Sequence, residues 1–313
     1  MKTYKPSIIF FGTPDFAVPT LQALIREDYD VILVVTQAAK PVGRKQILTS
    51  TPVKIEAKKL SLPVGTDLAE LKKYHADLGV VAAYGELIPK KILDLFPLGV
   101  LNIHPSLLPK YRGPSPIQTA ILNGDKETGI TIIKLDAKMD HGEKLKAQSL
   151  KLKADDGYKS LSESLALLGA KMLVEILPDY LNDKIKLLPQ DDSQATFTKI
   201  ISKEDGKINW QKSAEQIERQ IRAYAPWPGC YAEFMVNGKK INVKIVFARV
   251  CDNVTTHNCA SLHGDNQENI GKFTSKDNFL YIRCGHGALL VETLQPEGKK
   301  EMSAREFING YLR

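Results

Sequence analysis

Short apolar runs alternate with amphipathic stretches through the first half of the chain. The apolar runs end at glycine or polar residues and have the length of buried strands in a parallel sheet. They cover residues 7–12, 31–37, 78–85 and 99–104. The run at 130–136 alternates differently, so we expect an outer or antiparallel strand there. With helical stretches at 16–28 and 160–177, the pattern predicts an α/β domain with a Rossmann-like, mostly parallel sheet.

The pattern of apolar and polar positions changes in the last third of the chain. A helix at 213–224 begins with Ser213 and Gln216 in capping-box spacing. Two hairpins follow, one over 231–250 with an Asn-Gly turn and one over 279–294. This pattern predicts a mostly β domain, an OB-fold-like β-barrel.

A length of 313 residues favours two domains over one core. The segment between the two patterns is polar and irregular, as linkers are. We therefore expect an N-terminal domain over 1–188, a linker over 189–206 and a C-terminal domain over 207–313.

The first apolar run stops too early for a signal peptide, and no stretch has the length of a membrane span. We expect a cytoplasmic protein with no membrane partner. A net charge of +7 fits an anionic partner such as nucleic acid, and it fits a lysine-rich solvated surface equally.

Four potential metal ligands lie close together in the sequence, namely Cys251, His257, Cys259 and His263. Their spacing fits no zinc template, and the segment around them is a polar loop by composition. We expect no metal.

Asn102 and His104 are the most informative polar pair. They end an apolar run, and residues two apart in a strand project to one face. Ligand crevices of doubly wound sheets lie at the carboxyl ends of strands. With Asp140, which follows the run at 130–136, the pair has the groups for acyl transfer to an amine. Asn and a protonated His stabilise an oxyanion, and Asp holds the imidazole or relays a proton. The alternative is a strand-end histidine satisfied by backbone.

The stretch NIHPSLLPKYRG at 102–113 closely resembles the signature of the folate-dependent formyltransferases. The resemblance implies Asn102, His104 and Asp140 as catalytic residues and 10-formyltetrahydrofolate as co-substrate, with no metal. It also implies a folate site at two segments, 82–89 and 106–109. The folate-site residues are Tyr84, Gly85, Ile88, Ser106, Leu107, Leu108 and Pro109.

Further stretches resemble the family members that act on methionyl-tRNA. They are FFGTPDFAVP, KPVGRK, KIISKEDGKINW, IRAYAPWPG and LQPEGKKEMSAREFING. The resemblance implies a monomer that formylates the α-amino group of initiator methionyl-tRNA for translation initiation. The alternatives are a formyltransferase for an amino-sugar nucleotide or another small amine, and a binding module without catalysis.

Two groups of basic residues are expected to contact tRNA. The resemblance implies that Lys40, Arg44 and Lys45 lie in an inserted loop that contacts tRNA. Without the resemblance, the same stretch is an ordinary surface loop by its composition. The β domain adds Lys239, Lys240, Lys299 and Lys300. The sequence departs from the family at Met139-Asp140-His141-Gly142, where Leu-Asp-Thr-Gly is usual. Arg112 has two possible roles, to bind phosphate or folate carboxylate or to brace its loop.

Overall fold

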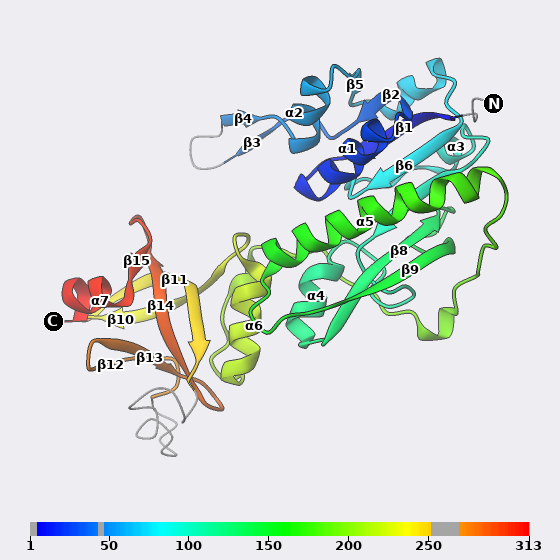
Figure 1. Ribbon diagram of the computed structural model, residues 1–313. Helices are drawn as coiled ribbons and strands as arrows, with labels where there is room; N and C mark the ends of the chain where they lie inside the picture. The colour runs from blue at the N-terminus through cyan, green and yellow to red at the C-terminus, as the bar shows by residue number, and fades with distance from the viewer. Residues whose placement is uncertain (1–4, 43–46, 252–268, 313) are drawn as a thin grey trace. The chain divides into compact units, whose positions relative to one another are not determined.

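The computed structural model describes residues 5–42, 47–251 and 269–312 (Figure 1). The chain forms two compact units. The first contains residues 1–117, 126–153 and 160–199, and the second contains 118–125, 154–159 and 200–313. Residues 189–199 therefore group with the first unit, and the domain bounds expected from the sequence stay a prediction.

The first unit is built on a seven-stranded sheet of order β5-β2-β1-β6-β7-β8-β9. The strands are β1 (Ser7–Gly12), β2 (Asp30–Val35), β5 (Val64–Gly65), β6 (Leu78–Ala82), β7 (Val100–His104), β8 (Glu127–Lys134) and β9 (Glu143–Lys151). The first five are parallel, whereas β8 and β9 pair antiparallel. The predicted mostly parallel sheet and the antiparallel strand at 130–136 are confirmed.

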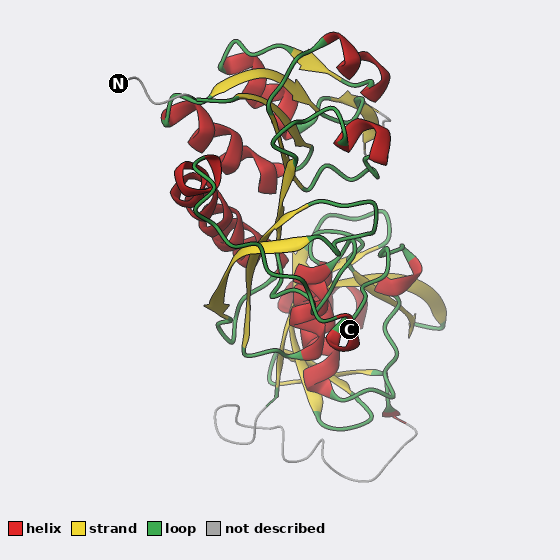
Figure 2. Cartoon of the chain, turned by 90° about the vertical axis from the view of Figure 1, so that its right-hand side faces the viewer, coloured by secondary structure: helices red, strands yellow, loops and turns green. Residues whose placement is uncertain are grey.

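Helices connect the strands of this sheet, and residues 118–125, which include most of one of these helices, group with the second unit. The helical segments up to Leu181 are η1 (Asp15–Ala17), α1 (Val18–Arg26), α2 (Pro52–Lys59), η2 (Leu68–Lys73), α3 (Lys90–Leu93), α4 (Pro116–Asn123) and α5 (Tyr158–Leu181). Helix α5 runs along the sheet at β7 and β8 (Figures 1 and 2). A Cβ on its Gly169 would come within 2.6 Å of Ile103, so glycine permits this close approach.

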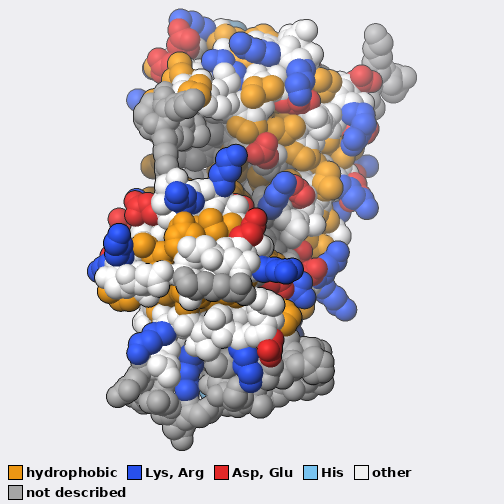
Figure 3. All heavy atoms as spheres, turned by 90° about the vertical axis from the view of Figure 1, so that its left-hand side faces the viewer, with side chains coloured by type: hydrophobic (Ala, Val, Ile, Leu, Met, Phe, Trp, Pro, Cys, Tyr) orange, Lys and Arg blue, Asp and Glu red, His pale blue; other side chains and the backbone are white. Residues whose placement is uncertain are grey.

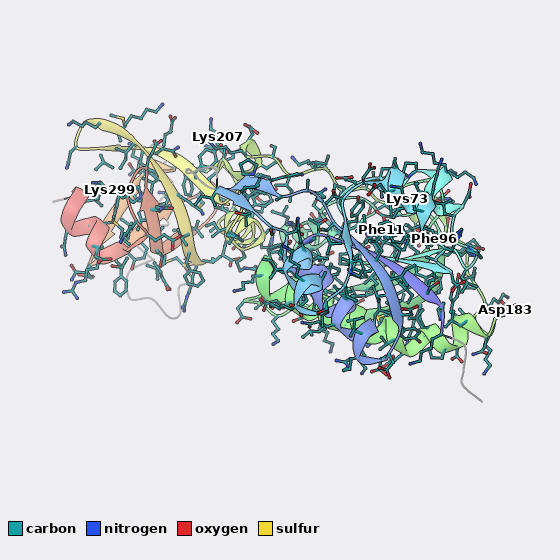
Figure 4. All side chains as sticks on the ribbon, turned by 90° about the horizontal axis from the view of Figure 1, so that it is seen from above. Phe11, Lys73, Phe96, Asp183, Lys207 and Lys299 are labelled. Atoms are coloured by element: carbon teal, nitrogen blue, oxygen red, sulfur yellow. The ribbon has the colours of Figure 1, made fainter. Side chains whose placement is uncertain are left out.

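Aromatic rings fill part of the core around β1. Phe11 on β1 makes edge-to-face contacts with Tyr84 and with Phe96, at centroid distances of 5.7 and 6.1 Å. Phe11 and Phe96 lie beside each other in Figure 4. Such pairs stabilise a core by about 0.5–1.5 kcal/mol beyond their buried area. They help to hold the ends of β1 and β6 in place.

The inserted loop expected around Lys40 contains a short antiparallel pair of strands, β3 (Lys40–Val42) and β4 (Ile47–Thr49). Ile47 and Leu48 on β4 are exposed. Arg44 and Lys45 lie outside the described residues.

The second unit is a curled antiparallel sheet of order β10-β11-β14-β13-β12, with β15 paired to β14. The strands are β10 (Cys230–Val236), β11 (Lys239–Val250), β12 (Phe273–Lys276), β13 (Phe279–Arg283), β14 (Ala288–Pro296) and β15 (Met302–Ser303). Register shifts in the β11–β14 pairing bend the sheet into a half-barrel. The predicted barrel-like β domain and both of its hairpins are confirmed.

Capping boxes start two helices of this unit. In α6 (Ala214–Tyr224), Ser213 and Gln216 exchange side-chain to backbone hydrogen bonds, and Ser303 and Glu306 do the same in α7 (Ala304–Phe307). The remaining helical turns are η3 (Asp192–Gln194), η4 (Glu204–Gly206) and η7 (Ile308–Leu312). Across the described ranges, no helix combines the length and the apolar character that crossing a membrane requires.

Candidate active site

Asn102 and His104 lie at the carboxyl end of β7, where the strand is buried over its full length. β7 pairs with β6 on one side and with β8 on the other, so both residues sit in the middle of the sheet. The two residues are 8% and 4% exposed. Two polar side chains buried this deeply need partners, because an unpaired buried polar group is costly.

Asp140 is the hydrogen-bond partner of Asn102 and lies near His104. It lies between β8 and β9 in a left-handed conformation, with φ of 47°. Its Oδ1 accepts from Asn102 Nδ2 at 3.3 Å and lies 3.5 Å from His104 Nδ1. Its Oδ2 accepts from the Gly113 backbone N–H at 2.8 Å. The structure thus brings together the three residues that the sequence indicated.

The two ring nitrogens of His104 face different groups. Nε2 lies 2.9 Å from the carbonyl oxygen of Tyr111, and Nδ1 faces the Asp140 carboxylate. A carbonyl only accepts, so Nε2 carries the proton in this geometry. Nδ1 can then donate only when the ring is charged. The backbone bond expected for an ordinary strand-end histidine is present, and the carboxylate contact comes in addition.

The buried hydroxyl of Thr131 on β8 hydrogen-bonds the loop after β7. Thr131 Oγ1 donates to Ser106 O at 2.7 Å and accepts from Leu108 N at 3.0 Å. Ser106 Oγ donates to Lys110 O at 2.5 Å, closing the loop on itself. Ser106 and Leu108 are buried, whereas Leu107 and Pro109 are partly exposed. This loop contains four of the expected folate residues.

The other expected folate residues follow β6, the neighbour of β7. Tyr84 and Ile88 are buried, and Gly85 is exposed with φ of 85°. Burial, with the nearby Glu86 carboxylate, raises the pKa of Tyr84 to about 12, so its hydroxyl stays neutral. Thr13 Oγ1 donates to Tyr84 O at 2.7 Å, and Gln37 Nε2 donates to Gly85 O at 3.1 Å. Residues just beyond β1 and β2 therefore hold this segment.

Arg112 is fully engaged inside the first unit. It is 4% exposed, and its guanidinium donates to Gln190 Oε1 at 3.1 and 2.9 Å and to Asp192 Oδ1 at 2.8 Å. Of the two roles open from the sequence, bracing is the one this geometry shows. Sequence reasoning missed Gln190, because it lies in a polar segment that predicts a linker.

His141, the residue after Asp140, is partly exposed and lies between two carboxylates. Its Nδ1 is 2.5 Å from Asp136 Oδ2 and its Nε2 is 3.4 Å from Asp192 Oδ2. The Arg112 guanidinium, followed by His141, holds the pKa of the Asp192 carboxyl below its usual value. His141 thus links the turn at Asp140 to the segment after α5.

The basic residues that were expected to contact tRNA and that the structure describes all lie on the surface. Lys40 Nζ donates to Gln37 Oε1 at 3.0 Å, and Lys240 pairs with Glu233 at 2.7 Å. Lys239, Lys299 and Lys300 are exposed. In the view of Figure 3, Lys and Arg side chains lie among side chains of other kinds.

Of the four potential metal ligands, Cys251 is buried and the other three lie outside the described residues. Among the residues that the structure describes, no three His, Cys, Asp or Glu side chains form a group suited to a metal ion.

Asn, His and Asp at the strand ends of this Rossmann-like sheet are the groups that acyl transfer to an amine requires, which indicates a group-transfer enzyme. The formyl transferase family model matches residues 5–177, and the model of the formyl transferase C-terminal domain matches residues 200–312. The chain belongs to the formyl transferase family.

Its curated relatives include the methionyl-tRNA formyltransferases of Roseiflexus castenholzii and Staphylococcus aureus. The first is 42% identical over 97% of this chain and 95% of its own length. The second is 39% identical over 97% of this chain and 96% of its own length.

Solved structures share the fold at low sequence identity. The tetrahydrofolic acid complex of HypX from Aquifex aeolicus has a TM-score of 0.67 at 14% identity, over 99% of this chain and 48% of HypX. WlaRD, a sugar 3N-formyl transferase, has a TM-score of 0.65 at 19% identity, over 95% of this chain and all of its own. At these identities the likeness shows the fold alone.

Proposed function

We propose that this enzyme transfers the formyl group of 10-formyltetrahydrofolate to the α-amino group of initiator methionyl-tRNA, giving N-formylmethionyl-tRNA. The observation that supports this most is the convergence of Asn102, His104 and Asp140 at the end of β7. It occurs in a chain about 40% identical, over nearly its full length, to methionyl-tRNA formyltransferases.

The nucleophile needs little activation. A free α-amine has a pKa of about 7.7–8.0, so a usable fraction is neutral at pH 7. The amine nitrogen attacks the formyl carbon, and the formyl oxygen takes up negative charge. Asn102 Nδ2 carries two hydrogens, of which the bond to Asp140 uses one. The second hydrogen donates to that oxygen, and His104 stabilises it through its charge when the ring is protonated.

Asp140 transfers the proton of the attacking amine to the folate. When the C–N bond forms, the amine nitrogen becomes positively charged and must lose a proton. The Asp140 carboxylate accepts it, directly or through water, and returns it to N10 of the folate as the bond from the formyl carbon to N10 breaks. The atoms balance without another reactant: the products are the formyl amide and tetrahydrofolate.

The folate binds along two stretches that the fold holds in place before binding. The loop over 106–109 is tied to β8 through Thr131, and Tyr84 and Gly85 are tied to the segments after β1 and β2. A preformed wall lowers the ordering cost of binding. Ser106, Leu107, Leu108, Pro109, Tyr84, Gly85 and Ile88 are the residues we assign to it.

The test is a comparison of acceptors. The full-length protein is incubated with 10-formyltetrahydrofolate and, separately, methionyl-tRNA, free methionine or a nucleotide-linked amino sugar. We expect rapid release of tetrahydrofolate and formylation only with methionyl-tRNA. An Asp140→Ala protein measured in parallel shows whether the transfer depends on the carboxylate at the end of β7.

Faster formylation of the amino sugar would replace the tRNA assignment by the sugar-formyltransferase alternative. Folate binding without transfer to any of the three amines would favour a binding module. Each result would overturn the proposal in a different way.

A further inference from the structure

The Gln190 side chain makes four hydrogen bonds that join two parts of the site. Its Nε2 donates to Asp140 O and to Gly142 O, both at 2.8 Å. Its Oε1 accepts from Arg112 Nε at 3.1 Å and from Arg112 Nη2 at 2.9 Å. A glutamine amide has two hydrogens and an oxygen with two lone pairs, so all its bonding capacity is used.

The partners of Gln190 also fix which way its amide points. Guanidinium groups only donate and carbonyl oxygens only accept. Turning the amide by 180° would place oxygen against two carbonyl oxygens and NH₂ against Arg112. Only one orientation satisfies the four partners, so glutamate, the isosteric acid, would face two carbonyls with no hydrogen to donate.

The backbone that Gln190 holds carries Asp140. The residue has φ of 47°, an uncommon conformation that the surroundings must maintain. Two residues on, a Cβ at Gly142 would lie 1.8 Å from Lys134 O, so this turn is packed against the end of β8. The turn direction decides where the Asp140 carboxylate points.

Arg112 positions the backbone donor to the second oxygen of that carboxylate. Gly113, the next residue, donates its N–H to Asp140 Oδ2 at 2.8 Å. The Arg112 backbone is itself fixed, because its N–H bonds Thr196 O at 2.9 Å and its carbonyl accepts from Thr198 N at 2.8 Å. The Gly113 amide is therefore held where the carboxylate needs a donor.

Residues 188–198 form a strap across this part of the first unit. At one end, the backbones of Leu188 and Lys144 exchange hydrogen bonds of 3.0 and 2.8 Å. At the other end, the strap is bound to the Arg112 backbone, and Gln190 lies between these two anchors. The strap therefore presents the Gln190 amide to the turn that carries Asp140.

We propose that Gln190, oriented by Arg112, is the positioning residue that aims the Asp140 carboxylate at Asn102, His104 and the reacting amine. The inference rests on the proposed function, since it concerns the rate of the same transfer. It assigns a role in the reaction to the strap, a segment whose sequence predicts a linker.

The kinetic test uses two replacements of similar size. Gln190→Glu removes both donors and adds a charge, and Gln190→Met removes the polar group without adding charge. Misplacing a catalytic group by about 1 Å can cost about 100-fold in rate. We expect the single-turnover rate constant to fall about 100-fold in Gln190→Glu and by a smaller factor in Gln190→Met, with the reaction amplitude and folate KM retained.

Gln194→Glu is the matched control. Gln194 lies in the same strap and is exposed, and its side-chain amide donates to Asp191 Oδ2 at 2.8 Å. The substitution is chemically the same but leaves Asp140 untouched, so its rate constant should stay within about twofold of the parent. A merely structural role of the strap would lower the melting temperature and the amplitude of both glutamate variants while leaving the rate constant of the folded fraction unchanged.

A second readout does not depend on activity. Arg112–Gly113 is the only Arg-Gly pair in the sequence, so protein labelled with carbonyl-¹³C arginine and ¹⁵N glycine gives one selected amide signal. That amide donates to Asp140 Oδ2, and its proton should shift upfield in Gln190→Glu and stay in place in Gln194→Glu.

An unmoved Gly113 signal, or rate constants equal in the parent and both Gln190 variants, would overturn the positioning role. If the parent protein itself formylates no methionyl-tRNA, the proposed function fails, and the amide signal still decides whether Gln190 sets the position of Asp140.

Discussion

At the residue scale, one carboxylate organises the site. Asp140 accepts from a backbone N–H and from Asn102, and it lies against His104 Nδ1. Asp140 therefore links the other two side chains, and removing it leaves Asn102 Nδ2 and the Gly113 N–H without this acceptor. Effects of residues that act as a unit are not additive.

We predict that Asn102→Ala, His104→Ala and Asp140→Ala each lower formyl transfer by at least about 100-fold, because an oxyanion donor or a proton carrier is lost. A double variant should be little worse than the slower single variant. Single-turnover rates at saturating substrate measure this, and circular dichroism shows that each variant is folded. A folded Asp140→Ala protein with a near-normal rate would remove Asp140 from the mechanism.

At the scale of elements, the loop after β7 depends on strand β8. Thr131 is fully buried on β8, and its hydroxyl pairs both Ser106 O and Leu108 N. One side chain of the sheet therefore satisfies a backbone acceptor and a backbone donor of the loop. Without the hydroxyl, both of these backbone groups lose their partner.

We predict that Thr131→Val destabilises the protein by about 1–3 kcal/mol for each backbone group left unpaired, and that it weakens folate binding because the loop loosens. Thr131→Ser keeps the hydroxyl and should retain folate affinity despite its smaller volume. Thermal unfolding and folate titration measure the two effects. Equal folate affinity in the valine and serine variants would separate the loop from the folate site.

At the scale of the whole molecule, the chain carries a net charge of +7. Lys and Arg side chains are visible in Figure 3, and Lys240 forms an ion pair with Glu233. A tRNA is a polyanion, and each lysine that binds a phosphate releases counterions, so affinity should fall steeply with salt. Exposed lysines such as Lys299, labelled in Figure 4, are the candidates for binding phosphate.

We predict that a Lys299→Ala, Lys300→Ala double variant binds methionyl-tRNA more weakly than the parent. Its salt slope should be smaller by somewhat less than one unit for each phosphate that the two lysines neutralise in the parent. A Lys72→Ala, Lys73→Ala variant removes the same charge from the first unit and serves as control. Binding is measured from low to physiological salt. Identical slopes for the two variants would make Lys299 and Lys300 part of an ordinary solvated surface.

Local patterns determined most of the elements. Apolar runs bounded by polar residues predicted β1, β2, β6 and β7, because a strand buried on both faces must be apolar throughout. Ser213 with Gln216 marked the start of α6, since a cap needs only residues three apart. Strand β9 escaped prediction, because its EKLKAQSLK sequence is largely polar and the strand is partly or fully exposed along its length.

For the site, the sequence determined only the pair on β7, because two residues of one strand necessarily share a face. The sequence offered Asp140 as a third group and the resemblance to known formyltransferases agreed, yet its contact with Asn102 spans 38 positions, so no local pattern places the two together. Gln190 lies 50 positions from Asp140 and 78 from Arg112. Only the tertiary structure decided these partners, since contacts between distant segments depend on how strands and loops cross, and no local pattern encodes that crossing.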